Sequence, residues 1–85
     1  MQIIEIFLED EKYQIEWALS EYFGELKGMK FNLNEVAAEQ IVMIDNLSEI
    51  AKILLSAVAG AVIQHLIDNG CQIDSIFKKG YFIIK

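Results

Sequence analysis

The chain has 85 residues, 54% of them apolar, and a formal net charge of −6 from 13 acidic residues and 7 lysines. This composition excludes a disordered chain and leaves room for one hydrophobic core, so we expect a single domain over residues 1–85. Arginine, the residue that best recognises phosphates and base edges, is absent, and together with the acidity this argues against nucleic-acid binding.

The N-terminal third predicts a strand followed by a helix. The stretch IIEIFL at 3–8 is short, apolar and rich in β-branched residues, as is typical of a strand. Over residues 9–24, apolar residues recur with helical spacing, acids crowd the start, and Gly24 follows the last of them. We therefore expect the first helix at 9–24.

The middle of the chain predicts two strands and a long helix. Apolar and polar residues alternate over 29–36, which indicates a half-buried strand, whereas the continuous apolar run at 40–45 is typical of a central strand. Asn46 or Ser48 can then cap a second helix that Gly70 would end, with a length of about 22 residues.

The last segments, CQIDSIF and YFIIK, flank KKG and predict a closing strand or a hairpin. The resulting order, β-α-β-β-α-β, predicts an α+β fold of the ferredoxin-like, split βαβ type, with an antiparallel sheet and two helices on one face. The strands at 3–8 and 40–45 would be central, and the strand at 29–36 would lie at an edge.

Four residues of the first predicted helix form a candidate partner-binding site. Tyr13 and Trp17 are four residues apart, opposite the apolar side of the helix, and Glu16 and Glu21 surround them. Because exposed tyrosine and tryptophan dominate binding hot spots, this pattern predicts an anchor for a protein partner. The alternative is a rotated helix in which Trp17 covers the edge of the core.

Two further sets of residues predict self-association. In the first strand, Ile3 and Phe7 lie on the side opposite the core residues, so a sheet with helices on one face would expose an apolar patch there. A symmetric homodimer would cover such a patch. In the second helix, the small residues Ser56 and Gly60 would allow another backbone to approach closely, within the fold or across a dimer.

The sequence does not favour a membrane protein. The apolar stretch at 50–67 is interrupted by Lys52, Gln64 and His65 and lies in a chain otherwise patterned as a soluble domain. A lone cysteine, Cys71, and the absence of a signal-like N-terminal segment suit a reducing compartment. We therefore expect a cytoplasmic protein.

No pattern of catalytic or metal-binding residues stands out. His65 and Cys71 are too few for a zinc site and have no evident orienting group for nucleophilic catalysis. The three acids at 9–11 lack the spacing of a calcium loop, and no phosphate-binding or hydrolase motif occurs. We expect no enzyme, no catalytic residue, no metal and no cofactor.

The surplus of apolar surface without chemistry predicts a protein-interaction module. Such a module would act as an inhibitor, immunity factor or adaptor, including the mobile-element or phage type, by occupying the surface of a protein partner, and would form a homodimer. The alternative is a small-molecule-sensing dimeric ferredoxin-like domain, for which Gln64, His65 and Asn69 are the available pocket polar groups. Structural self-assembly is a third hypothesis.

Overall fold

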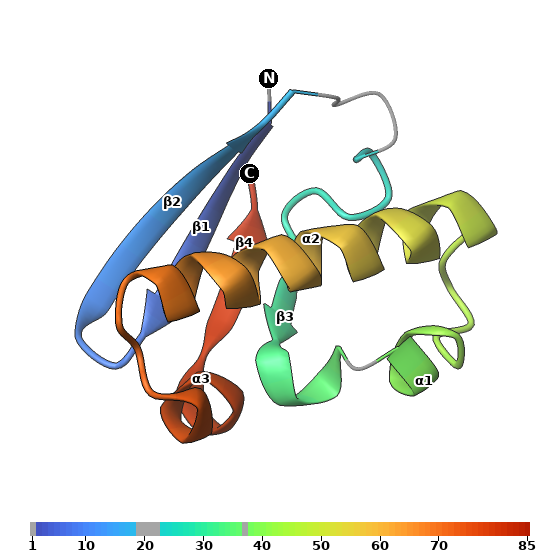
Figure 1. The fold of residues 1–85 in the computed structure, drawn as a ribbon. Coiled ribbons are helices and arrows are strands. Elements are labelled where there is room, and N and C mark those ends of the chain that lie inside the picture. The colour runs from blue at the N-terminus through green and yellow to red at the C-terminus, as the bar shows by residue number, and fades with distance from the viewer. Residues whose placement is uncertain (1, 19–22, 37) are drawn as a thin grey trace.

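Strands from both ends of the chain meet in one four-stranded antiparallel sheet, giving an α+β fold (Figure 1). The computed structural model describes residues 2–18, 23–36 and 38–85. The sheet has the order β2-β1-β4-β3, and α2 runs across one of its faces. The elements in chain order are β1 (Gln2–Leu8), β2 (Glu11–Trp17), β3 (Lys30–Asn32), the 3-10 helix η1 (Leu33–Glu35), α1 (Ala38–Ile41), α2 (Glu49–Asp68), α3 (Ile73–Lys79) and β4 (Tyr81–Ile84).

The predicted helix at 9–24 is wrong where the structure describes it, because residues 11–17 form β2. This strand pairs with the whole of β1, from Gln2 opposite Trp17 to Leu8 opposite Glu11, around a two-residue turn. Glu9 in that turn has a left-handed φ of 55°, so the acids at 9–11 close a hairpin instead of starting a helix. Pairing with an apolar neighbouring strand outweighs the local helical pattern.

The strand predicted at 40–45 is also wrong. Residue 41 ends α1, and the chain continues in turns in which Met43 N donates to Gln40 O (3.2 Å) and Ile44 N donates to Ile41 O (3.1 Å). A short apolar run is compatible with either a strand or a helix, and this run has no strand beside it.

The C-terminal segment contains one strand and one helix. Residues 73–79 form α3, so the hairpin around KKG is wrong, but YFIIK does supply the closing strand, β4. It lies in the centre of the sheet beside β1. Gly80 joins the two elements, and a Cβ there would lie 2.5 Å from Ile76 O and 2.7 Å from Leu33 Cδ1. Glycine at this position lets α3 and η1 pack against the start of β4.

Three other predictions are confirmed at least in part. The long helix α2 begins after Ser48, whose Oγ accepts from Ala51 N (3.2 Å), and Gly70 follows its end with φ 82°. The strand at 3–8 is central, and an edge strand forms within 29–36, but only over Lys30–Asn32. The β-α-β-β-α-β order is not found, because β2 replaces the first predicted helix, and α1 and turns replace the strand predicted at 40–45.

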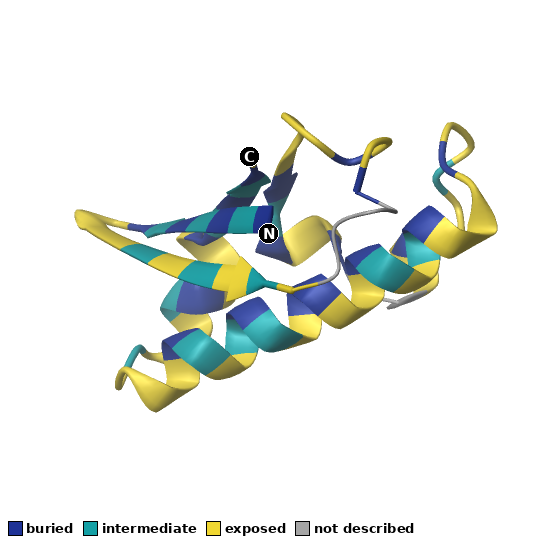
Figure 2. Cartoon of the chain, turned by 90° about the horizontal axis from the view of Figure 1, so that it is seen from above, coloured by how far each residue is buried: buried dark blue, intermediate teal, exposed yellow. Residues whose placement is uncertain are grey.

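The core lies between the sheet and α2 (Figure 2). Ile4, Ile6 and Leu8 alternate inward along β1, and α2 turns a buried stripe towards them. The buried residues of α2 are Ala51, Leu55, Val58, Ala59, Val62 and Leu66. The opposite face of the sheet carries no helix of the described chain (Figures 1 and 2).

Candidate interaction surfaces

The predicted anchor residues lie on β2, and the two aromatic residues face inward. Tyr13 and Trp17 are half-buried against the core, Tyr13 edge-to-face with His65 (centroids 5.9 Å apart) and Trp17 edge-to-face with Phe23 (6.2 Å). Trp17 thus covers the edge of the core, as in the alternative interpretation, but from a strand and not from a rotated helix. Glu16 is exposed on the opposite side of the strand, because side chains alternate across a sheet. Glu21 lies outside the described residues.

Tyr13 also ties β2 to the loop after α2. Its hydroxyl lies 3.4 Å from Cys71 Sγ, within hydrogen-bonding distance. This hydrogen bond, followed by partial burial and the nearby charge of Glu11, raises the pKa of Tyr13 to about 12. The phenol therefore stays neutral well above physiological pH. His65 lies in the last turn of α2, and no cluster of three metal-binding side chains occurs in the described ranges.

A groove of about 360 Å³ runs between β2 and the C-terminal half of α2. Within it, Gln64 Nε2 donates to Asp68 Oδ1 (2.8 Å). The groove includes Glu16 as well as inward-facing residues of β2, so it reaches around the unpaired edge of that strand. Its lining residues are Ile15, Glu16, Trp17, Ala61, Gln64, His65 and Asp68.

The sheet face without a helix, called here the open sheet face, has a charged centre. Glu5 of β1 pairs with Lys12 Nζ (2.6 Å) on one side and Lys85 Nζ (3.1 Å) on the other, and its side chain is only 13% exposed. Hydrogen bonds to these two lysines hold the pKa of Glu5 below its ordinary value of 4.5. The other outward residues of the central strands are Ile3, Phe7, Tyr81 and Ile83.

Aromatic stacking and lysine side chains cover much of this face. Phe7 stacks on Tyr81 with centroids 4.9 Å apart. Lys30 Nζ lies 4.2 Å from the centroid of the Tyr81 ring, and Lys12 Nζ lies 5.6 Å from that of Phe7. Ile3 and Phe7 are half-buried, so the apolar side chains predicted to be exposed on this face are only partly exposed. Their role in self-association stays a prediction.

Bare apolar side chains gather instead around the N-terminal half of α2. Val42 and Met43 in the turn after α1 are 64% and 78% exposed, and Ile50 and Ile53 of α2 are 53% and 70% exposed. These four residues are called here the α2 end patch. The exposed acids Glu39, Asp45 and Glu49 each lie within three residues of a patch residue along the chain. Met29, Ile67, Ile73 and Phe77 are exposed elsewhere. The patch therefore holds part of the apolar surplus, on a different element from the one predicted.

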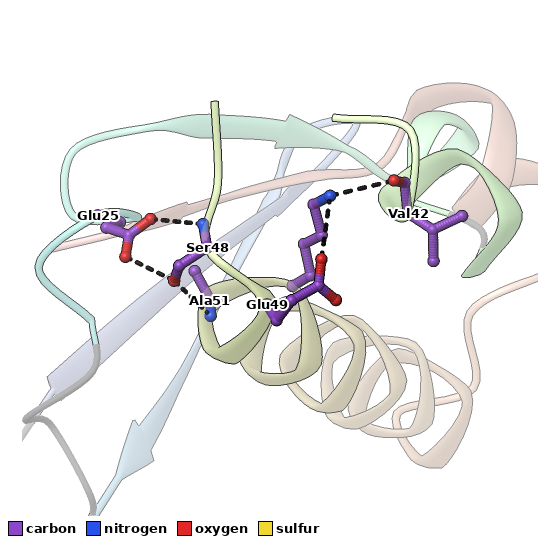
Figure 3. A network of polar contacts seen from close by, with 6 residues as sticks. Glu25, Val42, Ser48, Glu49 and Ala51 are labelled. Carbon is purple, nitrogen blue, oxygen red and sulfur yellow. Dashed lines mark hydrogen bonds and ion pairs between the residues drawn. The ribbon is translucent and has the colours of Figure 1, made fainter. Parts of the chain in front are cut away.

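Polar contacts hold the elements of the α2 end patch together (Figure 3). Ser48 N and Ser48 Oγ donate to the Glu25 carboxylate (2.9 and 2.6 Å), and the same Oγ caps α2. Lys52 Nζ donates to Val42 O (3.1 Å) and lies 3.8 Å from Glu49 Oε1. The hydrogen bonds from Ser48 lower the pKa of Glu25 below 4.5. The turn after α1 is thus fixed beside the start of α2.

Gly60 of α2 makes no close contact with the described part of the fold. Ser56 and Gly60 are both exposed, and a Cβ at Gly60 would meet nothing within 4 Å. The expectation of close packing within the fold is therefore wrong for Gly60. Close packing across a dimer stays a prediction.

Helix α2 is also long and apolar enough, by length and composition alone, to cross a membrane. An 18-residue window within Glu49–Asp68 has a mean hydropathy of 1.8, and a third of that window is buried in the fold. The core helix of a small soluble domain has the same properties.

No family model, no curated protein and no solved structure matches this chain.

Proposed function

We propose that this protein is a cytoplasmic interaction module that binds a protein partner through the α2 end patch. The observation that carries the proposal is the exposure of Val42, Met43, Ile50 and Ile53, four large apolar side chains at one end of the molecule. Contiguous exposed apolar side chains with a polar rim are typical of protein interfaces. The fixed geometry of the patch, through Ser48 and Lys52, reduces the entropy lost on binding.

The charge around the patch indicates the chemistry of the partner. Glu39, Asp45 and Glu49 are exposed acids within three residues of the patch along the chain, and Lys52 is already engaged with Glu49 and Val42. A partner that offers an apolar groove bordered by lysine or arginine would match both features. An inhibitor of a basic, nucleic-acid-handling protein is one role that fits this chemistry.

The test compares two variants with the same chemical change at two exposed helical isoleucines. Ile53→Asp lies in the patch, whereas Ile73→Asp on α3 lies outside it and serves as the matched control; the two side chains are 70% and 58% exposed. Affinity capture from the native host should recover a protein with wild type and Ile73→Asp that Ile53→Asp does not recover. With that protein purified, Ile53→Asp should weaken binding about tenfold or more, and added salt should weaken the wild-type complex.

Equal capture by both variants would contradict the assignment of the patch, as would a complex whose affinity does not depend on salt. Trp17→Ala provides a separate test of the predicted anchor of Tyr13, Trp17, Glu16 and Glu21. If the anchor binds the partner, Trp17→Ala should also lose the captured protein while its folding, measured by circular dichroism, is retained.

The groove between β2 and α2 favours a second candidate function, the sensing of a small molecule. Its volume of about 360 Å³ lies in the range of ligand sites, and Gln64, His65 and Asp68 bring polar groups to one wall. A bound metabolite would raise the melting temperature of the wild type more than that of a Gln64→Leu variant. A metabolite screen in which no compound changes the melting temperature would count against this function.

A further inference from the structure

The β2 edge of the sheet is a second surface, separate from the α2 end patch. Strand β2 lies at one end of the sheet order and is seven residues long, so its outer edge offers backbone groups that no other described strand pairs. The other edge, β3, has only three residues. A long unpaired edge beside a groove is the arrangement that accepts an added strand.

The structure shows which residues of β2 present those backbone groups. Lys85 N donates to Ile3 O (2.9 Å), so Ile3 directs its carbonyl to β4 and not to Glu16, its neighbour on β2. Hydrogen-bonded and non-bonded pairs alternate along an antiparallel ladder. The Ile3–Glu16 pair is therefore non-bonded, and so are the Glu5–Gln14 and Phe7–Lys12 pairs. As a result, Lys12, Gln14 and Glu16 point their N–H and C=O groups towards the open edge.

The sequence of β2 is complementary to itself about Gln14. In an antiparallel pair of two copies centred there, Lys12 lies opposite Glu16 of the partner subunit, and Tyr13 lies opposite the partner's Ile15. Because the two copies are related by a two-fold axis, each of these contacts occurs twice. Both members of every hydrogen-bonded pair in this register, 12 with 16 and 14 with 14, have edge-pointing backbone groups.

The neighbouring two-fold registers lack this complementarity. Centring the pair on Tyr13 would place Asp10 opposite the partner's Glu16, two like charges, and centring it on Ile15 would place Lys12 opposite Ala18 of the partner subunit. Lys12 has room for a second carboxylate, because its side chain is 56% exposed although it already pairs with Glu5. Glu16 is exposed and has no ion pair among the described residues.

We propose that two copies of this chain pair antiparallel through β2, centred on Gln14, to form a continuous eight-stranded sheet. The added strand lies along the edge at which the groove opens, so Tyr13 of the partner subunit packs beside Ile15 and covers the apolar wall of the groove. Backbone hydrogen bonds provide the affinity, and the two Lys12–Glu16 pairs select the register.

The test reverses the charge at Glu16 and then at Lys12 as well, so that the second change restores opposite charges across the two-fold axis. Sedimentation velocity at physiological salt should show a concentration-dependent dimer for the wild type. Glu16→Lys places lysine opposite Lys12 twice and should raise the dimer dissociation constant about tenfold. Adding Lys12→Glu to the same chain restores opposite charges across the axis and should lower the constant again. Because Lys12→Glu also removes the Lys12–Glu5 pair, the Lys12→Glu single variant is measured beside it. Circular dichroism of all variants checks that the fold is intact.

A cross-link reports the register directly. In a Cys71→Ser chain, Gln14→Cys places two thiols across the two-fold axis at a Cα separation of about 5.5 Å, which suits a disulfide. It should form a covalent dimer on mild oxidation, whereas Asp10→Cys, whose symmetry mate lies several residues away, should not. A monomer at all concentrations overturns the proposal. A dimer that Glu16→Lys leaves unchanged, or that the double swap fails to restore, overturns the assignment to β2.

Discussion

The open sheet face and the outward side of α2 differ in how their apolar side chains meet water, although the rest of the described chain covers neither. On the sheet, neighbouring strands hold side chains side by side, so Phe7 stacks on Tyr81 and lysine stems lie over both rings. On the helix, outward side chains diverge from a convex surface, and Ile53 is 70% exposed. Apolar composition alone therefore does not locate an interface, because secondary structure decides which apolar residues cover one another.

The largest expected effect comes from the core shared by the two regions. Phe82 of β4 is fully buried between the sheet and α2 and packs against Phe31 with centroids 5.4 Å apart. Phe82→Ala should lower the free energy of unfolding by about 3–5 kcal/mol, because it leaves a cavity under both surfaces. Urea denaturation followed by circular dichroism measures this. A loss below about 1 kcal/mol would mean that the sheet and α2 do not share one packed core.

A direct comparison of the two surfaces should give unequal effects. Phe7→Ala removes a stacked ring from the open sheet face and should lower the free energy of unfolding by about 1–2 kcal/mol. Ile53→Ala removes an exposed side chain from α2 and should change it by no more than about 0.5 kcal/mol. The same urea titration measures both. Equal losses would show that the open sheet face is as bare as the helix.

A stabilising substitution should be available on the outward side of α2. Gly60 has helical neighbours and open space around its missing Cβ, so Gly60→Ala should raise the free energy of unfolding by about 0.5–1 kcal/mol. Thermal melting of dilute protein measures the gain. If Gly60→Ala instead weakens self-association in sedimentation, then the predicted close contact of Ser56 and Gly60 across a dimer gains support.

The smallest effect concerns how the two regions respond to pH and salt. The pKa of Glu5 is lowered in the folded state, so its contribution to stability is complete above about pH 4.5 and is lost as the pH falls through the folded pKa. The stability difference between wild type and Glu5→Gln should therefore shrink on acidification below that value. Added salt at neutral pH should reduce the difference, because the partners of Glu5 are lysines.

Glu25 is the matched control for this measurement. Its pKa is also lowered, but by the neutral hydrogen bonds from Ser48 at the start of α2. The difference between wild type and Glu25→Gln should follow the same acid dependence and change little with salt. If salt changed both stability differences equally, then the conclusion that Glu5 is stabilised by ion pairs and Glu25 by neutral hydrogen bonds would be wrong.

Several features were predictable from local sequence because local chemistry determines them. The caps at Ser48 and Gly70 bracket α2, and the alternation of Ile4, Ile6 and Leu8 identifies the inward face of β1. The predicted helix over β2 failed for a different reason. The helical spacing over 9–24 depended on apolar residues after Trp17. Within β2 alone, Tyr13, Ile15 and Trp17 alternate with polar residues, as is typical of a strand.

The interaction surfaces were less predictable. Tyr13 and Trp17 were expected on the outward side of a helix and lie on the inward side of a strand. Val42 and Met43 were expected on opposite faces of a central strand, and both are exposed in a turn. Each assignment depended on which element the residue belongs to. A signal for the β2 edge was nevertheless present, since EKYQIEW places a lysine and a glutamate symmetrically about Gln14.

By itself, the sequence determined the α+β class, the long capped helix, the central position of β1 and the surplus of apolar side chains. Only the tertiary structure decided where that surplus is exposed. Short apolar runs such as residues 40–45 and 81–84 have similar local preferences, and long-range pairing with β1 selects one of them as the central strand. The run left without a strand partner places Val42 and Met43 at the surface, beside α2.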